Sequence, residues 1–121
     1  MGSEAEPKAV AAMKQYEIRW ANLPEPVGRR PVLLLTRTSG YAYLNKVIVA
    51  EVTSTIRNIP EEVSLGKSDG LRGPSVVNLD NVHVVPKNLL GDRIGALPAS
   101  RERQVKRAIG YAFDWPELKM L

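Results

Sequence analysis

Cysteine is absent from the 121-residue chain, and histidine occurs only once, as His83. The first absence excludes disulfide bonds and thiolate metal sites, and it makes the cytoplasm the expected location. The second excludes an acid–base pair of two histidines within one chain and disfavours a histidine-rich metal site. We therefore expect a protein without a metal or other cofactor.

Long apolar runs are also missing. The longest contain four or five residues, whereas a membrane-spanning helix needs about 20. Residues 1–15 lack the basic start and apolar centre of a signal peptide. The chain contains no P-loop, no Rossmann glycine pattern, no HExxH and no GxSxG, which disfavours the enzymes that rely on these motifs.

The composition is that of a soluble globular protein of one domain, with 44% hydrophobic and 25% charged residues. Seventeen lysines and arginines against thirteen acidic residues give a net charge of +4. For a small domain, this charge weakly favours polyanionic partners.

Alternating and short apolar segments predict a mainly β fold of about seven short, mostly antiparallel strands. The predicted strands are 16–21, 31–37, 46–54, 61–65, 74–79, 82–85 and 93–97. One helix follows from about Pro98, with Val105, Ala108, Ile109 and Ala112 facing the sheet. Short strands with frequent turns favour a bent sheet or small barrel. We expect a mobile arm at 1–15, a folded domain at 16–113 and a poorly ordered tail at 114–121.

The main functional indication lies at the ends of two predicted strands. One begins directly after Arg30, and the other ends at Thr53 and Ser54. If these strands are antiparallel neighbours, the guanidinium lies near the hydroxyl. A guanidinium suits a phosphate oxygen, and a hydroxyl can position the attacking or leaving oxygen. This pair fits RNA transesterification driven by alignment and electrostatics, although a solvated arginine and a turn threonine are the structural alternative.

A family resemblance extends over about residues 16–113. The segments that carry it are YEIRW (16–20), GRRPVLLL (28–35), VAEVTS (49–54), EVSL (62–65), GPSVVNLDNV (73–82) and LLGDRIGAL (89–97). In this order and spacing they resemble the MazF/PemK endoribonuclease toxins of type II toxin–antitoxin systems.

The resemblance implies a small CcdB/PemK-like β-barrel with a flanking helix, which forms a homodimer and cleaves single-stranded mRNA without a metal. The products would be a 2′,3′-cyclic phosphate and a 5′-OH, and a cognate antitoxin would block the RNA groove. The family's Arg-Pro and Thr-Ser motifs fall on Arg30 and Thr53, the expected catalytic residues. Its base-reading pair falls on Asp80 and Asn81. Further RNA contacts are expected from Arg29, Glu25, Ser54 and Arg57.

The sequence departs from the family pattern before the Arg-Pro motif. The loop there is shortened to residues 22–29, and only Glu25 can stand in for the family's acidic or histidine residue. Two alternatives remain open. One is a CcdB-type gyrase poison, for which Phe113 and Trp115 lie near the end of the chain, and the other is an RNA-binding module without catalysis.

Two further side chains have more than one interpretation. Trp20 alternates like a core residue, with base stacking as the alternative. His83 stands among valines on a predicted strand, where a structural or exposed role is favoured over a catalytic one.

Overall fold

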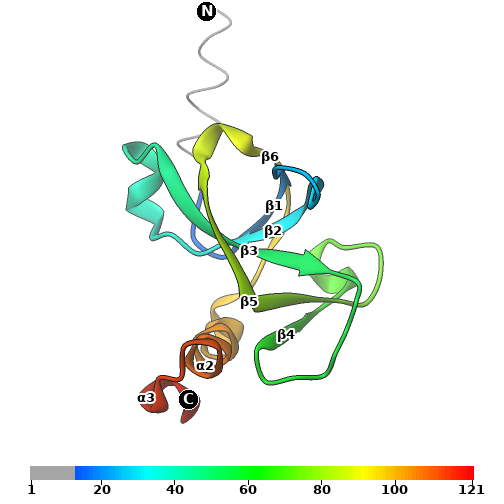
Figure 1. The fold of residues 1–121 in the computed structure, drawn as a ribbon, viewed down its shortest axis with the longest axis vertical. Helices are drawn as coiled ribbons and strands as arrows, with labels where there is room; N and C mark the ends of the chain where they lie inside the picture. The colour runs from blue at the N-terminus through cyan, green and yellow to red at the C-terminus, as the bar shows by residue number, and fades with distance from the viewer. Residues whose placement is uncertain (1–12) are drawn as a thin grey trace, which may run out of the picture.

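Residues 13–121 are described by a computed structural model, shown in Figure 1. Six strands form one antiparallel sheet in the order β4-β5-β3-β2-β1-β6. Their bounds are β1 Glu17–Asn22, β2 Arg29–Leu34, β3 Lys46–Thr53, β4 Glu62–Leu65, β5 Ser75–Pro86 and β6 Leu90–Ala96. The helices are η2 Thr38–Ala42, η3 Lys67–Asp69, η4 Lys87–Leu89, η5 Ala99–Arg101, α2 Glu102–Phe113 and α3 Pro116–Lys119. The predicted mainly β fold with a C-terminal helix is confirmed.

The two long apolar segments are antiparallel neighbours at the centre of the sheet. Strand β2 pairs with β3, with Val32 opposite Glu51 and Leu34 opposite Val49. Strand β2 ends three residues earlier than predicted, because the hydroxyl of Thr36 accepts the Ile48 N–H at 2.8 Å in place of a backbone carbonyl. The chain then enters η2, where the sequence predicted a turn.

Strand β5 corrects the prediction of two strands joined through Asp80 and Asn81. Ala50 pairs with Val82 while the next residue of β3 pairs with Asn78, so residues 79–81 form a bulge within one strand. The Asn78 side chain accepts the Asp80 N–H at 2.8 Å. Asp-Asn is typical of a turn, but a bulge uses the same residues to bend a strand without ending it. The sheet therefore has six strands, not seven.

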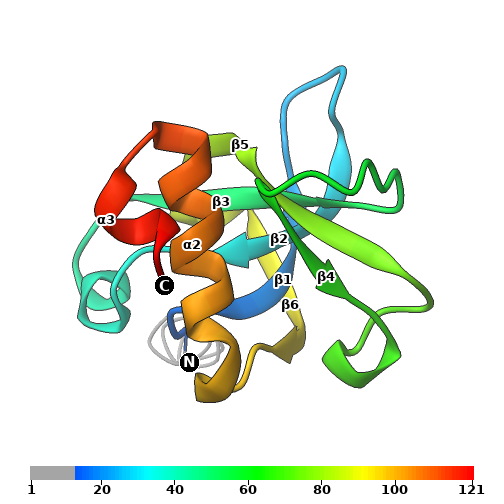
Figure 2. The same ribbon diagram turned by 90° about the horizontal axis from the view of Figure 1, so that it is seen from below.

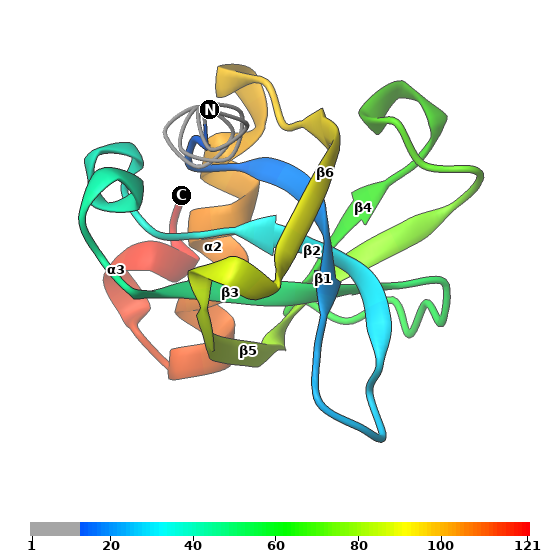
Figure 3. The same ribbon diagram turned by 90° about the horizontal axis from the view of Figure 1, so that it is seen from above.

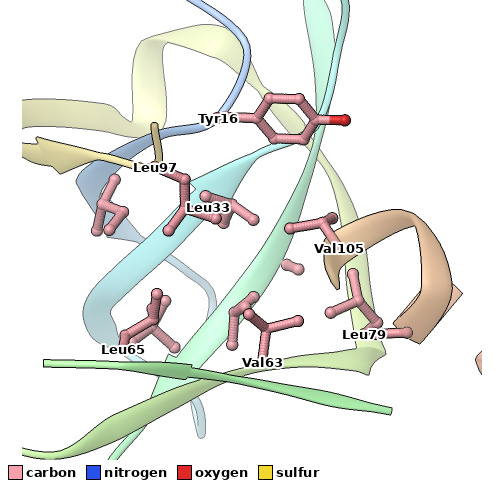
Figure 4. Packing of buried hydrophobic residues seen from close by; sticks show 12 residues of the cluster. Tyr16, Leu33, Val63, Leu65, Leu79, Leu97 and Val105 are labelled. Carbon is pink, nitrogen blue, oxygen red and sulfur yellow. The ribbon is translucent and has the colours of Figure 1, made fainter. Parts of the chain in front are cut away.

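The sheet is buried on both faces. On one face, Ile18, Leu33 and the other buried residues shown in Figure 4 pack beneath α2. Figure 2 shows α2 lying across this face. Val105 and Ala108 of α2 are buried as predicted, with Ile109 and Ala112 packed at the edge. A second cluster on the other face includes Val32, Leu34, Tyr41, Val47 and Val49.

The barrel closes where β6 meets the loop of residues 66–74. A Cβ on Gly95 would lie 2.0 Å from the backbone oxygen of Asp69, and one on Gly70 would lie 2.3 Å from that of Ile94. Two backbones can approach this closely only because glycine occupies both positions. Gly70 also has a φ of +94°, which favours glycine. This contact fixes the loop against the sheet edge.

The predicted terminal arm and tail both need correction. Residues 1–12 of the arm lie outside the described residues, while Met13 is buried and belongs to the fold. Residues 116–119 form α3, contrary to the predicted disordered tail. Asp114, with a φ of +56°, reverses the chain, and Gly110 lets α3 approach α2 so closely that a Cβ there would lie 2.7 Å from Leu118. No helix within residues 13–121 is long and apolar enough to cross a membrane.

Candidate active site

A cavity of about 680 Å³ opens where β2 begins and β3 ends. Strand β6 and the loop of residues 66–74 form the rest of its wall. Figure 3 shows the backbones of β1, β2, β3 and β6. The lining residues are Trp20, Arg30, Pro31, Val52, Thr53, Ser54, Gly70, Leu71, Arg72, Gly73, Pro74, Ser75, Arg93 and Ile94. This volume is in the range of ordinary ligand sites.

Arg30, Thr53 and Ser54 are brought together in this cavity. The last β2–β3 pair is Val32 with Glu51, and continuing the antiparallel register by two residues places Arg30 opposite Thr53. The Thr53 hydroxyl oxygen accepts the Thr55 N–H at 3.1 Å, which orients it at the end of the strand. Because the hydroxyl keeps its own proton for donation, it can still bind a phosphate oxygen.

Glu51 orients the Arg30 guanidinium. Nη1 of Arg30 lies 3.3 Å from Oε1 of Glu51, whose other oxygen lies 2.5 Å from Nε2 of His83. The Glu51 side chain is only 11% exposed, whereas those of Arg30 and His83 are about one third exposed. Nε of Arg30 is buried and has no hydrogen-bond partner among the described residues. The guanidinium is therefore held at one nitrogen and retains donors for a ligand.

Trp20 is a cavity residue, although its alternation with Ile18 favoured the core. It is only partly buried, and it lines the cavity between Arg30 and Arg93. The guanidinium carbon of Arg29 lies 4.0 Å from the centroid of the indole ring. A cation over an aromatic face at this distance is attractive, so Arg29 and Trp20 form a flat, positively charged rim.

The cavity lining includes Arg30, Arg72 and Arg93, and it contains no aspartate or glutamate. A cavity with three guanidinium groups and no acidic lining favours anions. Sequence reasoning missed Arg72 and Arg93. Arg72 stands in a glycine- and proline-rich loop, a weak signal, and Arg93 stands in an ordinary predicted strand, which gave none.

Five predicted RNA-binding residues are absent from the cavity lining, and four of them, all except Arg29, also lie away from its rim. Glu25 is exposed in the β1–β2 loop beside Gly28. Arg57 is exposed, and its backbone N–H donates to the Glu62 carboxylate. Asp80 lines a separate hollow of about 400 Å³ beside α2, and Asn81 is exposed next to it. The roles of these four residues stay predictions.

Phe113 and Trp115 form an aromatic pair at the end of α2. Their ring centroids are 4.9 Å apart, and the side chains are 49% and 46% exposed. Phe113 also lines the smaller hollow with Asp80. The feature that motivated the gyrase-poison alternative is therefore on the surface, away from the larger cavity.

Comparison with known proteins gives consistent results. The profile of the family "PemK-like, MazF-like toxin of type II toxin-antitoxin system" matches residues 14–113. "Endoribonuclease MazF3" of Mycobacterium tuberculosis is 46% identical over 85 residues, covering 70% of this chain and 82% of the relative. "Probable endoribonuclease MazF5" of the same organism is 38% identical over 99 residues, covering 81% and 90%.

Solved structures agree with the sequence relatives. The "Mycobacterium tuberculosis toxin MazF-mt6" superposes with a TM-score of 0.77 at 43% identity, covering 81% of this chain and 96% of that one. An "Endoribonuclease in complex with its cognate antitoxin from Mycobacterial species" gives 0.74 at 27% identity, covering 87% and 98%. The profile match extends over most of the chain and includes both strand ends that form the cavity. The chain therefore belongs to the PemK-like, MazF-like toxin family of type II toxin–antitoxin systems.

Proposed function

We propose that the protein is a toxin endoribonuclease that cleaves single-stranded mRNA in the larger cavity, with Arg30 and Thr53 as its catalytic residues. The observation that carries the proposal is that both residues line one cavity that holds three arginines and no carboxylate. The names of the relatives, endoribonucleases MazF3 and MazF5, support the same activity.

The proposed reaction is transesterification, which uses the nucleophile already present in RNA. The 2′-oxygen attacks the adjacent phosphorus and loses its proton, the bond from phosphorus to the 5′-oxygen breaks, and the departing oxygen takes up a proton. The products are a 2′,3′-cyclic phosphate and a 5′-OH. Arg30 donates to the equatorial oxygens as negative charge develops, and Thr53 holds the scissile phosphate in line. None of these roles requires a metal.

Other predicted residues contribute at different distances from the cut. Ser54 lines the cavity and Arg29 stands at its rim, so both contact the strand near the scissile phosphate. Asp80, Asn81, Glu25 and Arg57 contact nucleotides farther along the strand. The shortened loop, with Glu25 outside the cavity, supports a base preference that differs from that of relatives with a longer loop.

The proposed assembly is a cytoplasmic homodimer that a cognate antitoxin inhibits. Exposed apolar side chains support a protein interface, because Ile48 and Val84 are cross-strand partners and are 43% and 65% exposed. The antitoxin complex among the solved relatives supports the inhibitor. An acidic antitoxin segment would complement both the cavity arginines and the net charge of +4.

The test is cleavage of mixed-sequence RNA in EDTA by the wild type and by the Arg30→Ala and Thr53→Ala variants. Arg103→Ala removes one positive charge from the exposed surface of α2 and serves as the matched control. We expect EDTA-resistant cleavage with cyclic-phosphate ends in the wild type and the control, and loss of about 10²-fold or more in each cavity variant. Full activity of Arg30→Ala would refute the assigned site. Gyrase inhibition without cleavage would support the poison, and RNA binding alone would support the inactive module.

A further inference from the structure

The cavity contains a second cationic position, formed by Arg93 of β6 and Arg72 of the loop 66–74. Arg93 stands two strands from Arg30 in the sheet, with β1 and its Trp20 between them. Arg30 pairs with Ala21 of β1 and Arg93 pairs with Arg19. With neighbouring strands about 4.8 Å apart and this offset of two residues, the two backbones are roughly 12 Å apart. Long arginine side chains can therefore hold two different anionic groups within one cavity.

Arg93 is anchored in the same manner as Arg30. Its Nε lies 3.1 Å from Oε2 of Glu17, whose side chain is only 7% exposed. Glu17 is fixed in turn by Nε of Arg19 at 2.9 Å and by the Lys14 N–H at 3.1 Å. The Arg93 side chain is 54% exposed, and within residues 13–121 its terminal nitrogens make no hydrogen bond. Each of the two arginines is thus oriented by a nearly buried carboxylate and presents free donors to the cavity.

Arg72 adds a charge with no counterion. It is exposed, lines the cavity and forms no ion pair among the described residues. Its loop is fixed by two close backbone contacts, of Gly70 with Ile94 and of Asp69 with Gly95. Ile94 and Gly95 lie on β6, the strand that carries Arg93. The loop contact therefore places the Arg72 and Arg93 backbones at the same wall of the cavity.

We propose that Arg93 and Arg72 bind the RNA phosphate adjacent to the scissile one, so that the cavity takes two consecutive phosphates of one strand. The proposal rests on the proposed function of the same site. Trp20, Leu71 and Ile94, which line the cavity with these arginines, offer an apolar surface to the nucleoside between the two phosphates. Because Glu17 anchors the Arg93 guanidinium, this side chain loses little freedom on binding, which favours phosphate over water.

The test measures binding, so that it does not depend on cleavage. A mixed-sequence 2′-O-methyl oligonucleotide, which lacks the attacking hydroxyl, is titrated in EDTA at several salt concentrations against the wild type, Arg93→Gln and Arg72→Gln. Arg103→Gln is the control, because it removes the same charge from the exposed surface of α2. We expect each cavity variant to weaken binding and to reduce the slope of log K against log salt by up to about 0.7, the full value for the one phosphate contact on a single strand that the two arginines share. The control should keep the wild-type slope.

A second measurement locates the phosphate. Once the wild-type cut is mapped, oligonucleotides carry one uncharged methylphosphonate either next to the scissile position or several nucleotides away. The neighbouring substitution should weaken binding to the wild type and have little effect on Arg93→Gln, and the distant one should affect both proteins equally. Equal effects of the neighbouring substitution on both proteins would overturn the proposal.

The outcomes separate this proposal from the proposed function. Cleavage by the wild type together with unchanged salt slopes in both arginine variants would refute the second phosphate position and leave the nuclease intact. Binding with Arg93- and Arg72-dependent slopes but no cleavage would refute the nuclease and support the anion position. Arg72→Gln should fold normally, because among residues 13–121 Arg72 has no buried partner that the substitution would leave unpaired. This variant therefore keeps the test decisive if Arg93→Gln misfolds.

Discussion

Arg30 and Glu51 form an ion pair on adjacent strands, with Nη1 of the arginine 3.3 Å from Oε1 of the carboxylate. The pair orients the guanidinium at the mouth of the cavity that Thr53 also lines. A neighbouring carboxylate reduces the net charge that substrate encounters, but it fixes the direction of the donors. The importance of Arg30 should therefore lie in its geometry as much as in its charge.

Arg30→Lys separates these two contributions. Lysine keeps the positive charge but loses the planar set of donors, so we expect the single-turnover cleavage rate to fall by about 10²-fold. The salt slope of binding to the 2′-O-methyl oligonucleotide should stay at the wild-type value, because the number of phosphate contacts is unchanged. A lysine variant that cleaves at the wild-type rate would show that charge alone is sufficient.

Glu51 and His83 should be coupled in stability. The uncharged amide in Glu51→Gln cannot hold Arg30 and His83 as strongly as the carboxylate does. We therefore expect the free energy of unfolding to fall by about 1–3 kcal/mol. His83→Ala removes the same 2.5 Å contact from the other side. The double variant should therefore lose less than the sum of the single losses, by more than about 0.5 kcal/mol in urea denaturation. Additive losses would show that the contact contributes nothing of its own.

The central strands were predictable because both carry strong local signals. Apolar runs predicted β2 and β3, and helical spacing predicted the buried face of α2 with Val105 and Ala108. The bulge of β5 was not predictable from Asp80 and Asn81, because the same residue types form turns and bulges, and pairing with β3 decides between them. The docking of α3 depends on the space beside Gly110, which is a tertiary property.

The candidate site was predictable only in part for the same reason. Arg30 and Thr53 stand at strand ends that the sequence pairs by their apolar patterns. Arg93 and Arg72 come from a sheet edge and a loop that meet through barrel closure, and no local pattern encodes that contact. The place of Trp20 in the cavity likewise depends on β6 and the loop 66–74. Alternation along β1 predicts on which face of the sheet the Trp20 side chain lies, but it does not predict which parts of the chain cover that face.

Gly95→Ala tests the barrel closure. The added methyl would meet the Asp69 carbonyl, which cannot move without shifting the loop that carries Arg72. We expect a loss of about 1–3 kcal/mol in urea denaturation, together with weaker oligonucleotide binding. Gly66→Ala is the control, because a Cβ there meets nothing within 4 Å and the backbone φ of −169° is ordinary extended chain. Equal stability of the two variants would show that the loop adapts without cost.

Tyr41 should make the fold sensitive to alkaline pH. Burial raises the pKa of Tyr41 to about 12 from the ordinary value of 10.0, and its side chain is fully buried. Since the folded pKa is the higher one, the contribution to stability is fully present below pH 10 and is lost as pH rises from 10 through about 12. One such group changes the free energy of unfolding by at most about 1.4 kcal/mol per pH unit in this window. Tyr41→Phe should therefore show a shallower loss of stability between pH 10 and 12 in urea denaturation, and identical slopes for the two proteins would contradict the assignment.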